Sequence, residues 1–185
     1  MTIIHMKVAL DPGHGGKDSG AVGPTGLEEA WVVLDIARRL EEELIASGFL
    51  TCLTRKSDVF VELGQRCEIA NDWGADYFVS IHCNSNGPDA VGIETLYKSQ
   101  KGLKLASPMQ RALIEATRDR DRGMKYRHDL HVLNATIMPA ILAEVGFISH
   151  PATEAKLATE DYRALLAKTI AGVLTDYVST DKPRA

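Results

Sequence analysis

Residues 8–18 read VALDPGHGGKD, an apolar run that passes directly into a loop rich in glycine and proline. The run of Val8, Ala9 and Leu10 is typical of a buried strand, because it is apolar at consecutive positions and ends at turn-forming residues. The loop that follows carries one imidazole, that of His14. In open α/β sheets, ligands bind beyond the carboxyl ends of the strands, so this loop is a candidate for a functional site.

Outward from this stretch, the chain alternates between strand-like and helix-like periodicity. Strands are expected at 7–10, 49–54, 77–81, 91–97 and 139–147, and helices at 27–48, 62–72, 103–120 and from Tyr162 to Tyr177. Residues 12–26 are expected to form a long functional loop, and the charged residues 121–129 a mobile one. This alternation predicts an α/β fold in layers, with a mostly parallel central sheet flanked by helices.

Length and composition are typical of one globular domain. The chain has 185 residues, of which 45% are hydrophobic and 25% charged, which is enough for one well-buried core. We therefore expect one domain over residues 1–179 and a polar tail over residues 180–185. A net charge of -4 with scattered basic residues does not favour nucleic acid as a partner, and no apolar run is long enough for a membrane span.

Cysteines and the amino-terminal residues add two expectations. Cys52, Cys67 and Cys83 form no CxxC pair, so we expect buried free thiols. Residues 1–6 lack the charged and apolar regions of a signal peptide, so we expect a chain that does not export itself. A cytosolic protein, a mature domain cut from a longer precursor and an enzyme released by another route all fit.

Four ionisable residues lie where this architecture could bring them together. His14 and His82 each follow a predicted strand, Glu29 lies in the first turn of a predicted helix, and Glu144 interrupts the apolar run 139–147. Two neutral imidazoles and one carboxylate can hold zinc with a fourth position open for water, and a second carboxylate can take a proton from that water. Strand-end histidines are also commonly hydrogen-bonded in structural roles, and from residue types alone that alternative stays open.

The loop around His14 does not match the motifs that bind phosphate. Asp18 stands where the dinucleotide-binding fingerprint needs its third glycine, and the terminal Gly-Lys-Ser/Thr of a P-loop is absent. A phosphate cradle is therefore not indicated at this loop.

Six stretches of the chain, in their order and separations, closely resemble zinc-dependent N-acetylmuramoyl-L-alanine amidases, the amidase type 3 family of peptidoglycan hydrolases. The stretches are LDPGHGGKDSGAVGPTGLEE, TRKSDVFVELGQRCEIAN, ADYFVSIHCNS, GIETLY, DRGMK and MPAILAEVGFISHPATEAKL. The resemblance runs from Lys7 to about Tyr177. It implies cleavage of the amide between the lactyl group of N-acetylmuramic acid and the L-alanine that starts the peptide stem of peptidoglycan.

Carried over residue by residue, the resemblance implies that His14, Glu29 and His82 are the ligands of Zn²⁺ and that Glu144 is the catalytic glutamate. Glu29 is preferred to Glu28 because it stands five residues before Leu34, the spacing that the family's ligand glutamate keeps from a helix leucine, and Glu28 is then a solvated residue of the first turn. Glu144 is expected to take the proton of a zinc-bound water and to return it to the departing alanine nitrogen.

Other residues carry weaker expectations. Arg66 and Asp58 match recurring family positions, where a structural role and a binding role are equally compatible with the sequence. His128 and His131 are expected on the surface, with the substrate groove as the alternative. Cys83 stands where many members of the family have alanine, and a thiol at that position could compete for zinc.

Two other function classes stay open on the sequence. A zinc peptidase acting within the peptide stems would share the metal site, and a catalytically silent module would bind the cell wall without cleaving it. We expect a monomer that acts on the cell wall, outside the cytoplasm, as an endolysin or autolysin or as a trimmed mature domain.

Overall fold

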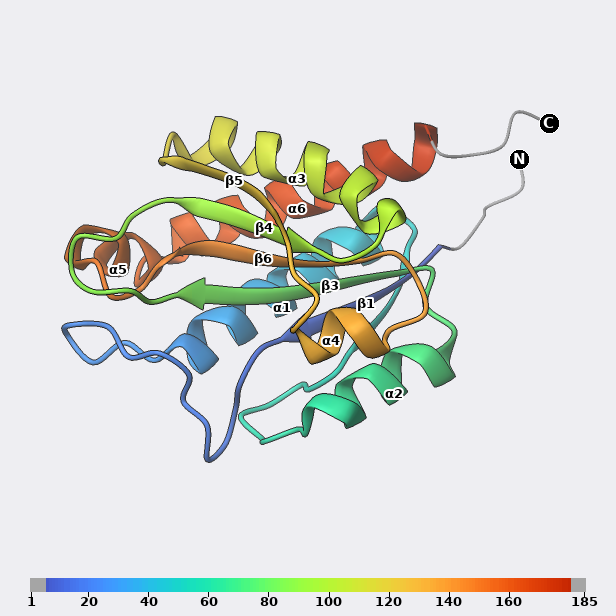
Figure 1. The fold of residues 1–185 in the computed structure, drawn as a ribbon, viewed down its shortest axis with the longest axis horizontal. Helices are drawn as coiled ribbons and strands as arrows, with labels where there is room; N and C mark the ends of the chain where they lie inside the picture. The colour runs from blue at the N-terminus through green and yellow to red at the C-terminus, as the bar shows by residue number, and fades with distance from the viewer. Residues whose placement is uncertain (1–5, 181–185) are drawn as a thin grey trace.

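Six strands form one sheet in the order β2-β1-β3-β6-β4-β5 in the computed structural model, which describes residues 6–180 (Figure 1). The strands are β1 Lys7–Pro12, β2 Leu50–Leu53, β3 Tyr77–Asn84, β4 Ile93–Tyr97, β5 Asp121–Tyr126 and β6 Ala140–Phe147. The first four in spatial order are parallel, β4 is antiparallel to β6, and β5 is parallel to β4. The predicted α/β class with a mostly parallel sheet is confirmed.

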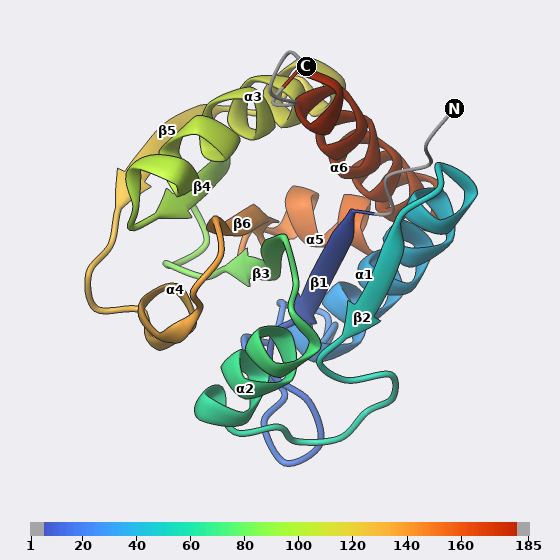
Figure 2. The same ribbon diagram turned by 90° about the vertical axis from the view of Figure 1, so that its right-hand side faces the viewer.

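Helices cover both faces of this sheet. They are α1 Glu29–Ala46, α2 Leu63–Trp73, α3 Gln100–Thr117, α4 His131–Ala135, α5 Pro151–Leu157 and α6 Glu160–Thr180. Figure 2 shows α1, α6 and α3 along one face, and α2 and α4 on the other. Within residues 6–180, none of these helices combines the length and the apolar character needed to cross a membrane.

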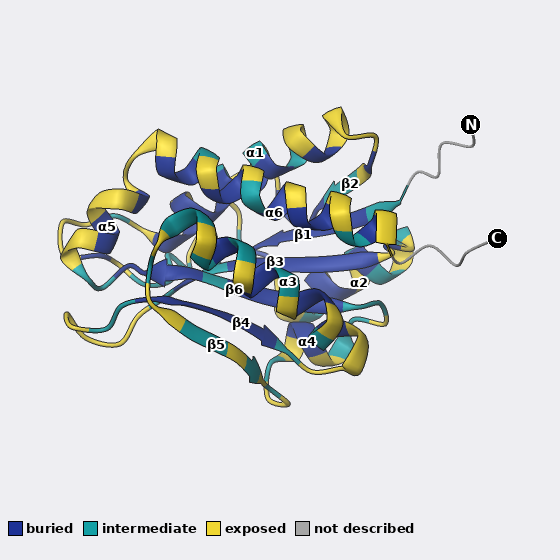
Figure 3. Ribbon diagram, turned by 90° about the horizontal axis from the view of Figure 1, so that it is seen from above, coloured by how far each residue is buried: buried dark blue, intermediate teal, exposed yellow. Residues whose placement is uncertain are grey.

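Two long periodic segments form helices, α1 and α6, whose apolar stripes face the sheet. In α1 the stripe comprises Ile36, Leu40 and Leu44, which are fully buried, and Gly48 follows the helix with a φ of 86°. The stripe of α6 is buried in the same way, and Figure 3 shows the inward sides of the helices buried and the outward sides exposed. Periodicity therefore predicted these helices correctly.

Three local expectations are corrected by the structure. Residues 121–126 form β5, an edge strand paired with β4, instead of the expected loop, because charged and glycine residues hide the strand pattern. The short helices α4 and α5 lie in segments where no helix was expected. The helical period of residues 62–72 predicts Leu63 on the inward face, but in α2 it is 56% exposed and Arg66 is buried instead. The expected tail, 180–185, lies outside the described residues apart from Thr180, the last residue of α6.

Candidate metal and catalytic site

Two buried arginines hold the loop that follows β1. The guanidinium of Arg55 donates to the carbonyl oxygens of Pro12 and Gly13 at 3.0 and 2.7 Å. Arg66 donates to the carbonyl oxygens of Pro12 and His14, both at 2.7 Å. His14 has a φ of 60°, a left-handed conformation that persists in a non-glycine residue only where its surroundings hold it. Arg66 therefore has a structural role beneath the site.

The charge of Arg66 is compensated by Asp11, which is 1% exposed. Arg66 Nη1 lies 2.9 Å from Asp11 Oδ1. The hydroxyls of Thr54 and Ser80 also donate to this carboxylate, each at 2.7 Å. A buried ion pair is tolerated when both charges are also hydrogen-bonded in this way. Neither Asp11 nor Arg55 is predicted from the sequence, because their partners lie 40 or more residues away or on the backbone.

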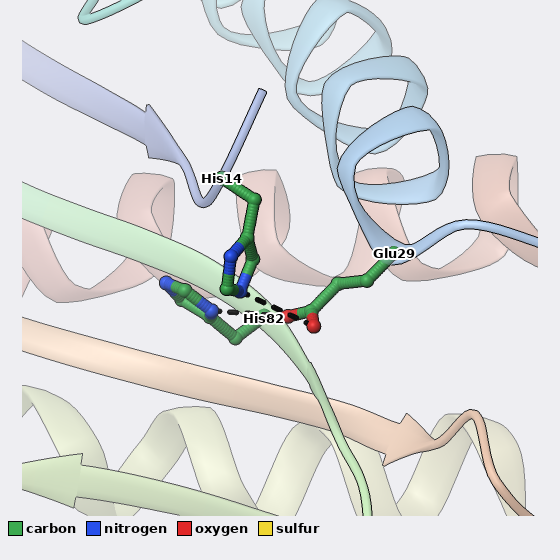
Figure 4. Close-up of side chains that lie close together, drawn as sticks. All are labelled: His14, Glu29 and His82. Carbon is green, nitrogen blue, oxygen red and sulfur yellow. Dashed lines mark hydrogen bonds and ion pairs between the residues drawn. The ribbon is translucent and has the colours of Figure 1, made fainter. Parts of the chain in front are cut away.

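Three side chains from separate elements converge in front of this loop (Figure 4). His14 comes from the loop after β1, Glu29 from the first turn of α1 and His82 from β3. Their potential ligand atoms lie within 4.8 Å of one another, and no other such group of three occurs in residues 6–180. His14 Nε2 lies 3.2 Å from Glu29 Oε2, and His82 Nδ1 lies 3.0 Å from Glu29 Oε1. His82 lies inside β3, which extends beyond the predicted end at residue 81.

Glu29 is fixed by the backbone as well as by the imidazoles. It is 3% exposed, and its carboxylate accepts hydrogen bonds from the amides of Ala21 and Cys83 at 2.9 and 2.8 Å. Glu28 is the exposed residue just before α1. The structure therefore directs Glu29, and not Glu28, toward the two histidines.

Asp18 orients the ring of His14, a role that sequence analysis missed. Its Oδ2 lies 2.9 Å from His14 Nδ1, while its Oδ1 accepts a hydrogen bond from the amide of Gly20 at 3.0 Å. A carboxylate on one ring nitrogen leaves the other nitrogen available as a metal ligand, as in many histidine–zinc sites. The only signal in the sequence was an acidic residue four positions after His14.

Two glycines let the side chains of the site lie directly on the backbone. A Cβ at Gly13 would lie 2.1 Å from Cε1 of His82. Gly20 has a φ of 66°, and a Cβ there would lie 2.7 Å from both His14 Cδ2 and Glu29 Oε2. Any larger residue at these positions would displace the candidate ligands.

The donor set of this site fits zinc. Two imidazole nitrogens and one carboxylate oxygen are typical zinc ligands, and three protein ligands leave a fourth position for water or substrate. Asp18 orients the ring of His14, and Gly13 and Gly20 have no side chains that would separate the three donors. That His14, Glu29 and His82 bind the metal stays a prediction.

Glu144 lies on β6 beside His82. The two residues are paired in the register of β3 and β6, so both side chains project from the same face of the sheet. Glu144 Oε2 is buried and has no hydrogen-bond partner among the described residues. Burial raises the pKa of Glu144 to about 7, with the charge of His82 opposing the shift. A carboxyl with such a pKa can accept and return a proton near neutral pH.

The carboxylates and imidazoles of the site shift one another's pKa values. Burial alone would lower the pKa of His14, but hydrogen bonds and charges from Glu29 and Asp18 raise it to about 9. Burial alone would raise the pKa of Glu29, but its hydrogen bonds to His14 and His82 hold it well below its usual range. Glu29 is therefore an anion at neutral pH, as a cation ligand must be.

A cavity of about 430 Å³ adjoins the two histidines. Most of its apolar wall comes from the segment 60–63 and from the start of α4, and includes Phe60, Val61, Leu63, Leu130 and Val132. His131 lies on the surface, as expected, and also lines this cavity. His128 is exposed and stacks on Tyr126. Leu63 is exposed because it lines this cavity.

Cys83 does not belong to the candidate metal group. Its side chain is 3% exposed within the main apolar core, and burial raises the pKa of its thiol well above the usual value. Its backbone amide, however, binds Glu29. All three cysteines are free, as expected, but only Cys67 and Cys83 are buried, and Cys52 is half-buried.

Known proteins match this chain over nearly its whole length. The N-acetylmuramoyl-L-alanine amidase family matches residues 8–176. The sporulation-specific N-acetylmuramoyl-L-alanine amidase of Bacillus subtilis is 39% identical over 168 residues, which cover 88% of this chain and 64% of that protein.

Two solved structures are similar over nearly the whole fold. The amidase AmiC2 of Nostoc punctiforme has a TM-score of 0.90 at 38% identity, covering 94% of this chain and 97% of that one. The catalytic domain of CwlV from Bacillus (Paenibacillus) polymyxa has a TM-score of 0.90 at 39% identity, covering 94% and 98%. The chain therefore belongs to the N-acetylmuramoyl-L-alanine amidase family of hydrolases.

Proposed function

We propose that this chain cleaves peptidoglycan at the amide between the lactyl group of N-acetylmuramic acid and L-alanine, as a zinc-dependent hydrolase. The observation that carries the proposal is the convergence of His14, Glu29 and His82 beside Glu144 at one end of the sheet. Family membership supplies the substrate class. We infer that the enzyme acts on the cell wall; its action as a monomer stays a prediction.

His14, Glu29 and His82 would hold the zinc ion. When bound, zinc acts as a Lewis acid that lowers the pKa of water to about 7 and polarises a carbonyl. Glu29 contributes the negative charge that favours a cation, and the amides of Ala21 and Cys83 keep its oxygens directed toward the histidines.

Glu144 would move the proton. Its buried Oε2 has no partner among the described residues, so it is available to accept the proton of the attacking water. The same carboxyl would then donate that proton to the departing alanine nitrogen, which becomes an amine. A pKa of about 7 suits both steps, because acceptance and donation are then similarly favourable at neutral pH.

Substitution of Glu144 tests this assignment. Glu144→Ala is expected to retain zinc, measured by metal analysis, and to lose turnover by at least about 100-fold, the usual contribution of a general acid–base group. His14→Ala and His82→Ala are expected to lose both zinc and turnover, because each removes a ligand. An active Glu144→Ala enzyme would contradict the role of Glu144.

Mass analysis of digested peptidoglycan tests the reaction itself. New alanine amino termini with free lactyl groups are expected. Cuts within the stems would instead show a peptidase, and binding without products would show a silent wall-binding module.

A further inference from the structure

Arg122, the second residue of strand β5, carries a guanidinium that two neighbours orient. Arg122 Nε donates to Glu94 Oε2 at 2.9 Å, and the Arg122 guanidinium carbon lies 4.7 Å from the centre of the Phe147 ring. Stacking and the hydrogen bond together fix the guanidinium plane. Among residues 6–180, neither terminal nitrogen of Arg122 has a hydrogen-bond or ion-pair partner. The two terminal nitrogens of Arg122 therefore form a preoriented fork, which can donate two hydrogen bonds to one further group.

The cluster around Arg122 has more positive than negative charge. Glu94 is 5% exposed and contacts two cations, Arg122 and Lys125, the latter at 2.5 Å. Its second oxygen accepts a hydrogen bond from Asn84 Nδ2 at 3.1 Å. One carboxylate thus faces two cations, and Arg122 and Lys125 remain partly exposed, at 27% and 41% of their side chains. The cluster is suited to a further anion.

The guanidinium of Arg127, unlike that of Arg122, is already paired with a carboxylate. Arg127 donates through Nε and Nη2 to Asp129 at 2.8 and 2.7 Å, so its fork already holds a carboxylate. The same bidentate pairing is available at Arg122 without any residue of the described chain to complete it.

Strand register places this fork beside the candidate catalytic site. Glu94 is directly opposite Glu144 in the antiparallel pair of β4 and β6. Strand β4 runs antiparallel to β6, and β5 runs parallel to β4. The start of β5 therefore lies at the end of the sheet where β1, β3 and β6 finish (Figure 1). The Cα atoms of two residues that are opposite in an antiparallel pair, here Glu94 and Glu144, lie about 5 Å apart. Phe147 lies three residues beyond Glu144 on β6, about 10 Å along the strand.

We propose that Arg122, oriented by Glu94 and Phe147, binds a carboxylate of the peptide stem and so selects acidic stems. Because Glu94, which orients Arg122, lies directly opposite Glu144, the bound carboxylate belongs to a stem residue that follows the scissile amide. A carboxylate matches the two free donors of a guanidinium in a bidentate pair. The inference rests on the proposed amidase activity and adds a specificity-determining residue to it.

Two matched synthetic substrates test the proposal. Both are muramoyl tripeptides beginning with L-alanine, one with free carboxylates on the second and third residues and one with these groups converted to carboxamides. Wild-type enzyme is expected to have a KM about 10- to 100-fold lower for the acid, the usual effect of a hydrogen-bonded charge pair. Arg122→Gln is expected to remove this difference by raising KM for the acid, with kcat for both substrates unchanged.

Two further variants separate charge, geometry and folding. Arg122→Lys keeps the cation but loses the fork, so it is expected to recover only part of the preference. Arg111→Gln, at an exposed arginine of α3 on the opposite face of the sheet, is the matched control and is expected to retain the full preference. Thermal unfolding of each variant shows whether the fold is intact.

The outcomes distinguish the two proposals. The role of Arg122 would be overturned if the wild type had equal KM values for the acid and the amide, or if Arg122→Gln changed both KM values equally. Arg122 would then only anchor β5. Turnover of neither muramoyl peptide by the wild type would overturn the amidase activity itself.

Discussion

At the scale of single residues, Asp18 shows how a side chain outside the ligand set controls a ligand. Its two oxygens join the ring of His14 to the backbone amide of Gly20. The His14 ring is thereby held in one orientation, with Nδ1 toward Asp18 and Nε2 toward Glu29. The orientation of His14 depends on this contact as well as on the strained backbone beneath it.

Asp18→Asn is therefore expected to weaken zinc binding by about 10- to 100-fold without unfolding the protein. An amide is a poorer acceptor than a carboxylate and leaves the imidazole less fixed. Competition with a chromophoric chelator measures the affinity. Glu28→Gln is the control, since Glu28 is exposed next to the candidate ligand Glu29, and its affinity should equal that of the wild type. Equal affinities of Asp18→Asn and wild type would rule out the orienting role.

At the scale of elements, short segments that escaped sequence analysis hold the site in place. Glu154 of α5 is buried and accepts hydrogen bonds from the amide and hydroxyl of Thr25 at 2.9 and 2.8 Å, and from the amide of Leu27 at 3.3 Å. These contacts fix the loop that leads into α1 and thus place Glu29. α5 is therefore part of the support of the site, although it contributes no candidate ligand.

Strand β5 is attached to the sheet partly by charge, which makes its attachment dependent on pH. Burial alone would raise the pKa of Glu94, but its hydrogen bonds to Lys125 and Arg122 lower it below the usual value. A carboxyl whose pKa is lower in the folded state contributes stability above its unfolded pKa, about 4.3, and this contribution disappears as the pH falls through the folded value.

Comparison of the wild type with Glu94→Gln tests this contribution. The variant is expected to have a lower free energy of unfolding at about pH 7, and the difference is expected to shrink below about pH 4. Urea titrations at both pH values measure it. Glu115→Gln, at an exposed residue of α3, should track the wild type throughout. A difference that stays constant with pH would show that the ion pairs of Glu94 do not supply it.

At the scale of the whole molecule, the apolar core and the candidate metal site make separate contributions to stability. Buried apolar clusters lie on both faces of the sheet, and they include Leu10, Ile141 and Leu166 on one side and Phe78 and Leu142 on the other. The site joins only the loop after β1, α1 and β3. We therefore expect the chain to fold without the metal, and we expect metal binding to stabilise the folded state.

Removal of zinc by a chelator is expected to lower Tm while the far-ultraviolet circular dichroism at room temperature stays unchanged. A ligand present at 100 times its Kd adds about 2.7 kcal/mol to the free energy of unfolding. His14→Ala should show no such response to zinc, because it lacks one ligand. Loss of helical signal upon chelation would instead show that the fold requires the metal.

Local pattern in the sequence was enough to predict the layered α/β class and the long helices, since helical periodicity and buried strand runs are properties of neighbouring residues. Local pattern did not select His14, Glu29, His82 and Glu144 as site residues; the resemblance of their motifs to a known family did. Edge strand β5 was missed because an edge strand buries little and shows no alternation.

Tertiary structure decided what depends on contacts between distant residues. Asp11 and Arg66 are 55 residues apart, and Thr25 and Glu154 are 129 apart, yet each pair supports the site directly. Arg122 acquires its orientation only from Glu94 and Phe147 on two other strands. The sequence by itself determined the α/β class and the long helices, because both follow from local pattern, and the resemblance to a known family selected the candidate site residues. Only the folded chain determined which charges are paired, buried or left available, because those properties arise where distant segments meet.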